Sequence, residues 1–419
     1  MKESSTLARV DADRLWADLM KIAEFTEPAK PYTRRCFSPL FTQARNWLKQ
    51  RFTDCGVSVR IDAAGNLVGR LDGTAPGAGT IMMGSHCDTV SGGGRFDGVA
   101  GVIGALEIAR SLKEQGFKPR HNLEFVDFLA EEANVFGLSC VGSRGMSGFL
   151  DEKMLAYSSP DGETLGQAIT AVGGDEKRIV EAKRTDIRAF FELHIEQGPI
   201  LENECHEIGL VTGIVGIRRI EIIFRGEADH AGTTPMRLRR DAAAAAAETM
   251  VLVRKLAEGM ALLKQGHFVA TVGFVEVQPN AANVVPESAR MIVDVRSEDR
   301  ALLEKFTAAL DTATTVTAAL LRVDREALTI LSDSMPSSCN DDLRTLLGDC
   351  ARDMRLSTRD LASGAGHDTG FISKIAPAAM VFVPCRKGKS HSADEWADSD
   401  ALEEGANVVA EAIIRFDSR

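Results

Sequence analysis

The sequence predicts an α/β protein of two domains, the smaller one inserted into a larger mixed-sheet domain. At 419 residues the chain is longer than a single hydrophobic core usually organises. Apolar strand patterns alternate with amphipathic helix patterns in the outer parts of the chain. Between residues 212 and 325 the order changes to β-α-β-β-α, which is typical of a separate α+β unit. We therefore expect one domain of residues 1–211 and 326–419 and an inserted domain of residues 212–325.

Composition excludes several classes of function. Hydrophobic residues at 44% and charged residues at 26% are ordinary values for a globular protein. The net charge of −11, without a block rich in Lys or Arg, argues against nucleic acid as a partner. The eight cysteines form no C-x-x-C pair and are expected to be free thiols. With no signal-peptide pattern and no apolar run of membrane-spanning length, we expect a soluble, cytoplasmic protein without a membrane partner.

The N-terminal region predicts two helices and a hairpin. Apolar residues at helical spacing mark Asp11–Ala23 and Gln43–Phe52 as helices. The segments Val57–Ile61 and Asn66–Leu71 alternate about a short Gly-containing turn, as a β-hairpin does. A Gly- and Pro-containing break over residues 73–79 separates this region from the next strand.

A strand-to-helix unit follows, and polar residues are concentrated in its connection. Thr80–Met83 is a strand candidate and Val99–Leu112 a helix candidate, and His86, Asp88 and Asp97 lie between them. A polar cluster at the exit of a buried strand is where α/β proteins usually bind ligands. His86 and Asp97 can coordinate a divalent cation, and Asp88 can accept the other N–H of the His86 ring. The alternative is a plain Gly-rich turn.

Three more apolar strands end in groups that could bind a metal. The strands are Leu123–Ala130, Ala189–Ile195 and Ala378–Val383, and the residues at or after their ends include Glu131, Glu132, His194, Glu196, Gln197 and His391. Each could separately be a charged strand end or a solvated loop. A dinuclear metal site at the carboxyl edge of one sheet explains them together. The residues alone do not assign ligand pairs, and they do not choose between His391 and His367, which lies in a Gly-rich segment.

The inserted region has its own order of elements. A β-rich segment, Val211–Phe224, leads to a polar segment that contains His230. An alanine-rich helix, two strands and a second helix are then expected at Ala242–Leu262, Phe268–Val277, Ala289–Arg296 and Ala301–Leu321.

Several motifs, in this order along the chain, resemble one known family. They are His86-x-Asp88, Asp97-Gly98, Glu131-Glu132, His194-Ile195-Glu196-Gln197-Gly198-Pro199, His230-Ala231-Gly232-Thr233-x-Pro235, Asp294-Val295-Arg296 and Ser390-His391-Ser392. Together they look like the hydantoinase/carbamoylase branch of the dinuclear-zinc aminoacylase and carboxypeptidase superfamily. The Gln-Gly-Pro sequence points to this branch over the peptidase branches.

The resemblance implies a role for each candidate residue. One metal would be bound by His86 and His194 and the other by Glu132 and His391, with Asp97 bridging. Glu131 would be the general base, Asp88 would orient His86, and His230 would stabilise the oxyanion. Substrate contacts would come from Gln197, His230, Asn283, Arg296, Gly366 and His367, with Asn283 and Arg296 holding a carboxylate. The resemblance further implies a cis peptide at Asp97–Gly98.

The implied activity is metal-dependent hydrolysis of the carbamoyl C–N bond of an N-carbamoyl-L-amino acid or related ureido acid. The products would be the amine, carbon dioxide and ammonia. Two divalent ions are expected, zinc first, with manganese, cobalt or nickel as alternatives. The resemblance also implies a homodimer through the inserted domain, with His230 reaching the partner's site as one option. Alternatives are an allantoate/ureidoglycolate-type amidohydrolase, a dipeptidase or aminoacylase with the same metals, and a catalytically silent metal-binding dimer.

Overall fold

The computed structural model describes residues 9–263 and 266–419, and these divide into two compact units. The first unit comprises residues up to 212 together with 339–361 and 366–419. The second comprises residues 213–338 and 362–365. The expected boundary at residue 325 is therefore wrong, because residues 326–338 pack with the second unit.

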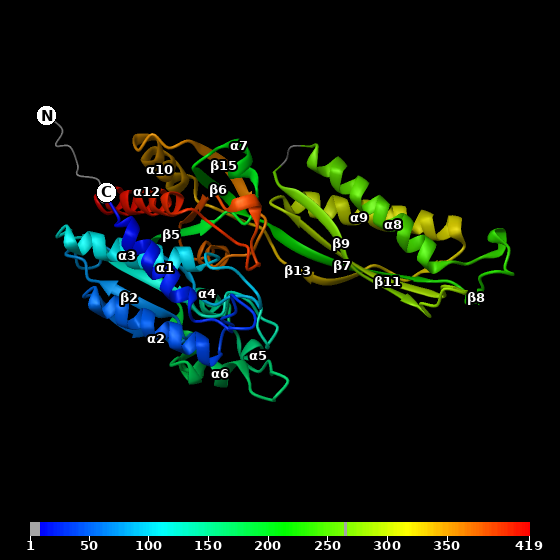
Figure 1. Cartoon of the computed structure of the whole chain (residues 1–419), viewed down its shortest axis with the longest axis horizontal. Helices are drawn as coiled ribbons and strands as arrows, with labels where there is room; N and C mark the ends of the chain where they lie inside the picture. The colour runs from blue at the N-terminus through cyan, green and yellow to red at the C-terminus, as the bar shows by residue number, and fades with distance from the viewer. Residues whose placement is uncertain (1–8, 264–265) are drawn as a thin grey trace. The chain divides into compact units, whose positions relative to one another are not determined.

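The first unit contains most of the helices and the larger sheet (Figure 1). Its elements, with β6 and β15 reaching past its limits, are α1 (Ala12–Ala23), α2 (Pro39–Asp54), β1 (Ser58–Ile61), β2 (Leu67–Leu71), β3 (Thr80–His86), α3 (Val99–Glu114), β4 (Asn122–Phe128), α4 (Val141–Ser147), α5 (Glu152–Leu155), α6 (Leu165–Ala171), η1 (Glu176–Ala182), β5 (Ile187–Ile195), α7 (Ile200–Glu204), β6 (Ile208–Ile214), α10 (Asp341–Asp353), β15 (Thr358–Ser363), α11 (Thr369–Ile372), β16 (Ala378–Val383), η3 (Arg386–Gly388) and α12 (Ser399–Asp417).

The larger sheet is mixed, as the sequence predicts. Its strand order is β1-β2-β4-β3-β5-β16-β6-β14, with β15 also paired to β6, where β14 is Ser337–Ser338. The central strands β4, β3, β5 and β16 are parallel, so their carboxyl ends meet at one edge. All six residues of β16 and all seven of β3 are buried, as expected for strands covered on both faces.

Helices cover both faces of this sheet. Helices α1, α3 and α12 lie side by side on one face (Figure 1). Every residue of α3 from Val99 to Leu112 is buried there. On the other face, Met146 of α4 and Ile372 of α11 pack with Phe128 and Phe190. The central strands, and with them the loops at their carboxyl ends, are thus held in a closed hydrophobic core.

The second unit is a smaller α+β layer structure. Its elements are β7 (Gly216–Arg225), β8 (Asp229–His230), η2 (Met236–Leu238), α8 (Ala242–Ala261), β9 (Phe268–Gln278), β10 (Val284–Val285), β11 (Ser288–Ser297), α9 (Arg300–Leu321), β12 (Asp324–Arg325) and β13 (Thr329–Asp333), with β14 following. The sheet order is β12-β7-β11-β9, and β13 also pairs with β7. Helices α8 and α9 lie side by side and pack on this sheet (Figure 1).

Strand β13 accounts for the misplaced boundary. It forms an antiparallel pair with β7, with Ile330 opposite Ile220. All five of its residues are exposed, so its sequence shows no alternation of apolar and polar residues. A strand without a buried face has no apolar alternation by which the sequence could reveal it.

Two further observations concern the cysteines and the possibility of a membrane-spanning helix. All eight cysteines are free thiols, as the sequence predicts. Among the helices of the described residues, none has the length and apolarity needed to cross a membrane.

The ion pairs of Asp333 should measurably stabilise the second unit. Arg300 on α9 and Arg218 on β7 both bond this carboxylate and lower its pKa from 3.8 to about 2. Because the folded-state pKa is lowered, the stabilisation is present above pH 3.8 and disappears as the pH falls towards 2. We expect Asp333→Asn to cost about 1 kcal/mol at pH 7, since the partly exposed pair is screened by solvent. The difference from the unsubstituted protein should shrink below pH 4 in urea unfolding.

A matched control is Asp324→Asn. Asp324 is the exposed partner of Arg240 in the same unit, and its removal should change the free energy of unfolding by less than about 0.5 kcal/mol. Equal effects of the two substitutions at pH 7 would contradict the assignment of residues 326–338 to the packed part of the second unit.

Candidate active site

The expected ligands meet at the carboxyl edge of the parallel strands. His86 is the last residue of β3, His194 is the penultimate residue of β5, and Glu132 and His391 follow β4 and β16. The structure brings together His86, Asp97 and His194 in one group and Asp97, Glu132 and His391 in another. Within each group the potential ligand atoms lie within 4.8 Å of one another, and only Asp97 belongs to both.

The two oxygens of Asp97 face different imidazoles. Nε2 of His194 lies 3.2 Å from Oδ1, and Nε2 of His391 lies 3.0 Å from Oδ2. Nε2 of His391 is also 3.3 Å from Oε1 of Glu132. The two carboxylates raise the pKa of His391 to about 10, since each stabilises its protonated ring. Converging imidazole nitrogens and carboxylate oxygens are a donor set suited to divalent cations, so the residues fit a pair of such ions.

Glycine at position 98 lets Asp97 approach the histidines. Gly98 has φ +66° and directly precedes α3. A Cβ at this position would lie 2.3 Å from Nε2 of His86. The expected cis peptide at Asp97–Gly98 is wrong, because the cis bonds in the described chain are Pro31–Tyr32 and Gln278–Pro279. The left-handed backbone of Gly98 makes the turn instead.

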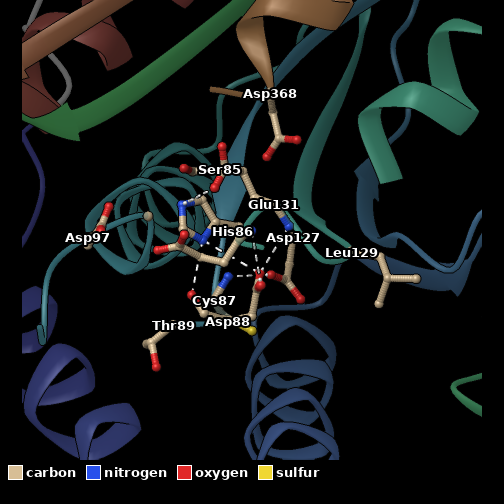
Figure 2. Close-up of polar contacts among 12 residues, drawn as sticks. Ser85, His86, Cys87, Asp88, Thr89, Asp97, Asp127, Leu129, Glu131 and Asp368 are labelled. Atoms are coloured by element: carbon tan, nitrogen blue, oxygen red, sulfur yellow. Dashed lines mark hydrogen bonds and ion pairs between the residues drawn. The ribbon is translucent and has the colours of Figure 1, made fainter. Parts of the chain in front are cut away.

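Asp88 holds the segment after β4 in place. Its carboxylate accepts the backbone N–H groups of Glu131, at 3.3 Å, and Glu132, at 3.2 Å. His86 Nδ1 lies 3.0 Å from the carbonyl oxygen of Asp88 but 3.6 Å from its carboxylate (Figure 2). Asp88 therefore orients His86 through its backbone, and its side chain positions the two glutamates.

Glu131 is buried beside the ligand groups but belongs to neither. Its Oε2 lies 3.6 Å from Nε2 of His86, and its Oε1 accepts the thiol hydrogen of Cys140 at 3.4 Å. Burial, together with the negative charge of Glu132, raises the pKa of Glu131 well above its usual value, although the charge of His86 opposes this. This carboxylate can therefore accept a proton from a group placed between the ligands.

Asp127 supports the segment that carries His86 and Asp88, although it belongs to none of the sequence motifs. Its Oδ1 accepts the N–H of Cys87 at 2.9 Å (Figure 2). Its Oδ2 bonds Nε of Arg45 at 2.7 Å. All three residues are buried. The ion pair of Asp127 and Arg45 thus holds the backbone at Cys87, between His86 and Asp88. A charged residue inside the apolar strand β4 is the signal that could have identified it.

His367 lies against His194, outside both groups that contain Asp97. The two rings meet edge to face with centroids 4.6 Å apart. Burial and the neighbouring His194 lower the pKa of His367 well below its usual value. The third possible group, formed with His194 and Glu192, is less suited to a cation, because Glu192 already accepts hydrogen bonds from Ser85 and Thr369. The geometry therefore favours His391 as the ligand.

The other expected substrate contacts of the first unit are Gln197 and Gly366. Gln197 follows β5 with φ +57°, and its amide Nε2 donates to Oγ of Ser390 at 3.2 Å. Gly366 directly precedes His367 in the segment between β15 and α11. A Cβ at Gly366 would meet nothing within 4 Å, so open space borders this position.

In the second unit, His230 and Asn283 are neighbours. Strand β8 pairs with β10, and the N–H of Ala231 donates to the carbonyl of Asn283 at 3.0 Å. Nδ1 of His230 accepts the backbone N–H groups of Gly232, at 3.0 Å, and Thr233, at 3.2 Å. In the neutral ring Nε2 must then carry the hydrogen, and the exposed ring can donate it to a ligand.

Arg296 lies at the other end of the same unit. It is opposite Ile217 on β7, whereas Ser288, the first residue of β11 after Asn283, is opposite Arg225. The eight steps along β11 from Ser288 to Arg296 span about 27 Å at about 3.4 Å per residue. Asn283 precedes one end of β11 and Arg296 lies near the other, and the contact of both with one carboxylate stays a prediction. Arg296 bonds Asp294 at 2.7 Å and the carbonyl of Gly364 at 2.8 Å, with the side chain 31% exposed.

Comparisons with known proteins agree with the fold and with the family that the motifs resemble. Residues 82–415 match the model of "Peptidase family M20/M25/M40". An N-carbamoyl-L-amino-acid amidohydrolase of Paenarthrobacter aurescens is 37% identical over 98% of this chain and 100% of its own. A ureidoglycolate hydrolase of Oryza sativa subsp. japonica is 34% identical over 97% of this chain and 85% of its own.

A crystal structure of an amidase of the hydantoinase/carbamoylase family from Burkholderia multivorans superimposes with a TM-score of 0.92 at 35% identity. The match covers 98% of this chain and 99% of that one. These findings confirm the resemblance that the motifs predict. The chain belongs to the M20/M25/M40 peptidase family, in its hydantoinase/carbamoylase branch.

Proposed function

We propose that this protein is a metal-dependent amidohydrolase that cleaves the carbamoyl C–N bond of an N-carbamoyl-L-amino acid or a related ureido acid. Water adds to the carbamoyl carbon, the C–N bond to the amino acid breaks, and the amine leaves with a proton. The carbamate that remains decomposes to carbon dioxide and ammonia. The observation that carries the proposal is one buried carboxylate, Asp97, shared by two ligand groups with the free carboxylate of Glu131 beside them.

Two divalent cations would be held by His86, His194, Asp97, Glu132 and His391. Zinc is our first choice because imidazole and carboxylate ligands suit it, and manganese, cobalt and nickel share this preference in part. When bound, such ions polarise a carbonyl group and increase the acidity of water.

The chain's own residues supply proton transfer and orientation. Glu131 takes the proton of the attacking water and later delivers it to the leaving nitrogen. Nε2–H of His230 donates to the oxygen on which negative charge develops. The partly exposed guanidinium of Arg296 binds the substrate carboxylate through two N–H groups.

The active assembly is a homodimer formed through the second unit. His230 follows Arg225, which lies opposite Ser288 at the end of β11 away from Arg296, and this separation supports a site shared by two chains. In the described part of the chain no strand pairs with the outer side of β9, which exposes Val269, Phe274 and Val275. Such an apolar edge is suited to pairing with a second copy. The free thiols suit a reducing compartment, and we place the enzyme in the cytoplasm.

A second candidate substrate class is ureidoglycolate or allantoate, which the rice ureidoglycolate hydrolase among the relatives favours. The same two ligand groups and their cations would act on these compounds in the same way. A dipeptidase or aminoacylase would also use this metal site. Specificity therefore depends on the groups that bind the rest of the substrate.

A substrate panel combined with Glu131→Gln tests the activity. The purified protein with zinc, manganese or cobalt should release ammonia from N-carbamoyl-L-amino acids faster than from allantoate or ureidoglycolate, and should leave dipeptides intact. Loss of the base should reduce turnover about 10²- to 10⁴-fold while metal content stays unchanged. The control is Glu196→Gln, because this buried carboxylate follows the parallel strand β5 and accepts the N–H groups of Ile200 and Leu201 instead. Normal turnover in Glu131→Gln would exclude the assigned base, and no turnover on any compound would favour the silent dimer.

Metal stoichiometry tests the ligand groups. We expect the unsubstituted chain to bind two zinc ions, His391→Ala to retain one, and Asp97→Ala to bind both weakly, because Asp97 is shared. Zinc content after dialysis and calorimetric titration give the numbers. His121→Ala is the control, since His121 bonds Asp417 and belongs to neither group. Full stoichiometry in Asp97→Ala would exclude a bridging ligand.

Mixing inactive variants tests the shared site. In a heterodimer of Glu131→Gln and His230→Ala chains, one site contains both native groups only if His230 acts on the partner's substrate. After subunit exchange, an equal mixture should regain about one quarter of the unsubstituted rate, because half the dimers are mixed and half their sites intact. Ammonia release before and after exchange measures this. No recovery in a mixture with proven heterodimers would place His230 and Glu131 of one chain at the same site.

A further inference from the structure

Glu395 connects the two segments that carry Asp97 and His391. Its Oε1 accepts the backbone N–H of Phe96 at 2.7 Å and that of Asp97 at 3.1 Å. Its Oε2 accepts the hydroxyl hydrogen of Ser390 at 2.7 Å. One carboxylate thus bonds the backbone of the shared ligand and the residue directly before His391.

The surrounding residues leave a fitted space for this carboxylate. Glu395 is fully buried, and the adjacent Trp396 packs edge-on against Phe96 with ring centroids 5.8 Å apart. A Cβ on Gly94 would lie 1.9 Å from the Glu395 carboxylate. Glycine at position 94 is therefore required by Glu395 and not by the backbone angle, since its φ is not positive.

Burying a charge here is costly unless hydrogen bonds compensate it. Three donors from two separate segments provide that compensation for Glu395. The carboxylate belongs to none of the possible ligand groups in the described chain, so it acts on a cation only through other residues. Sequence reasoning missed it, because an acidic residue four positions after a histidine in a loop is not a distinctive pattern.

We propose that Glu395 is a positioning residue that holds Asp97 and the His391 segment in the arrangement that binds the second cation. The inference rests on the proposed metal-dependent function. Without Glu395, the N–H groups of Phe96 and Asp97 and the hydroxyl of Ser390 lose their shared partner. The two segments then move independently, and the cation must restrict both on binding.

The experiment measures cation binding to the full-length protein and does not depend on turnover. Calorimetry with zinc gives the affinities, and the visible absorption of the cobalt-loaded protein reports ligand geometry. We expect Glu395→Ala to weaken one or both cations about 10- to 100-fold and to change the cobalt spectrum. Glu395→Gln should retain most of the affinity, because its amide oxygen can still accept both N–H groups. Gly94→Ala should resemble Glu395→Ala, because the added methyl group displaces the carboxylate.

The matched control is Glu207→Ala. Glu207 likewise accepts a backbone N–H and a hydroxyl, both from Ser357, but lies outside the ligand groups. The Glu207→Ala protein should bind zinc with the affinity of the unsubstituted protein. If a folded Glu395→Ala protein binds both cations with native affinity, or if Gln is as harmful as Ala, the positioning role is excluded. If the unsubstituted protein itself fails to bind two cations, the proposed function fails first.

Discussion

The site depends on the carboxylate of Asp97 lying between two histidines that come from distant parts of the chain. Its two oxygens lie 3.2 Å from His194 and 3.0 Å from His391. This arrangement requires β3, β5 and β16 to end at one edge, which their parallel pairing ensures. It also requires a turn at Gly98 without a side chain, because His86 occupies that space. The larger sheet thus holds the imidazoles and carboxylates of the two ligand groups at one edge.

The acidic groups at this edge of the sheet repel one another, and bound cations would offset that repulsion. Several acidic groups are buried near one another at this edge, and the imidazoles of three histidines lie among them. The neighbouring carboxylates raise the pKa of His391 to about 10, and burial raises that of Glu131. The bonds from Asp88, Asp127 and Glu395 to backbone N–H groups hold this repulsive set together.

The sequence predicted the candidate ligands because they lie at or after the ends of apolar strands and interrupt the apolar pattern. It could not reveal the supporting bonds, since Glu395 and Cys140 reach their partners only through the tertiary fold. The limit of the second unit was missed because β13 is exposed along its whole length. The sequence also could not show that Asn283 and Arg296 lie towards opposite ends of β11, because positions along a sheet are not visible until the strand pairing is known.

The separation within the second unit bears on how a substrate is selected. A metal edge activates carbonyl groups of amides and ureas alike, so it discriminates little between them. Discrimination must come from groups that recognise the remainder of the molecule, and His230, Asn283 and Arg296 are the candidates outside the first unit. Since the first two adjoin the end of β11 away from the third, each proposed shared site would combine opposite ends of two copies. Pairing of the two chains would then help to define the substrate, and a change at the β9 edge could alter specificity without touching a ligand.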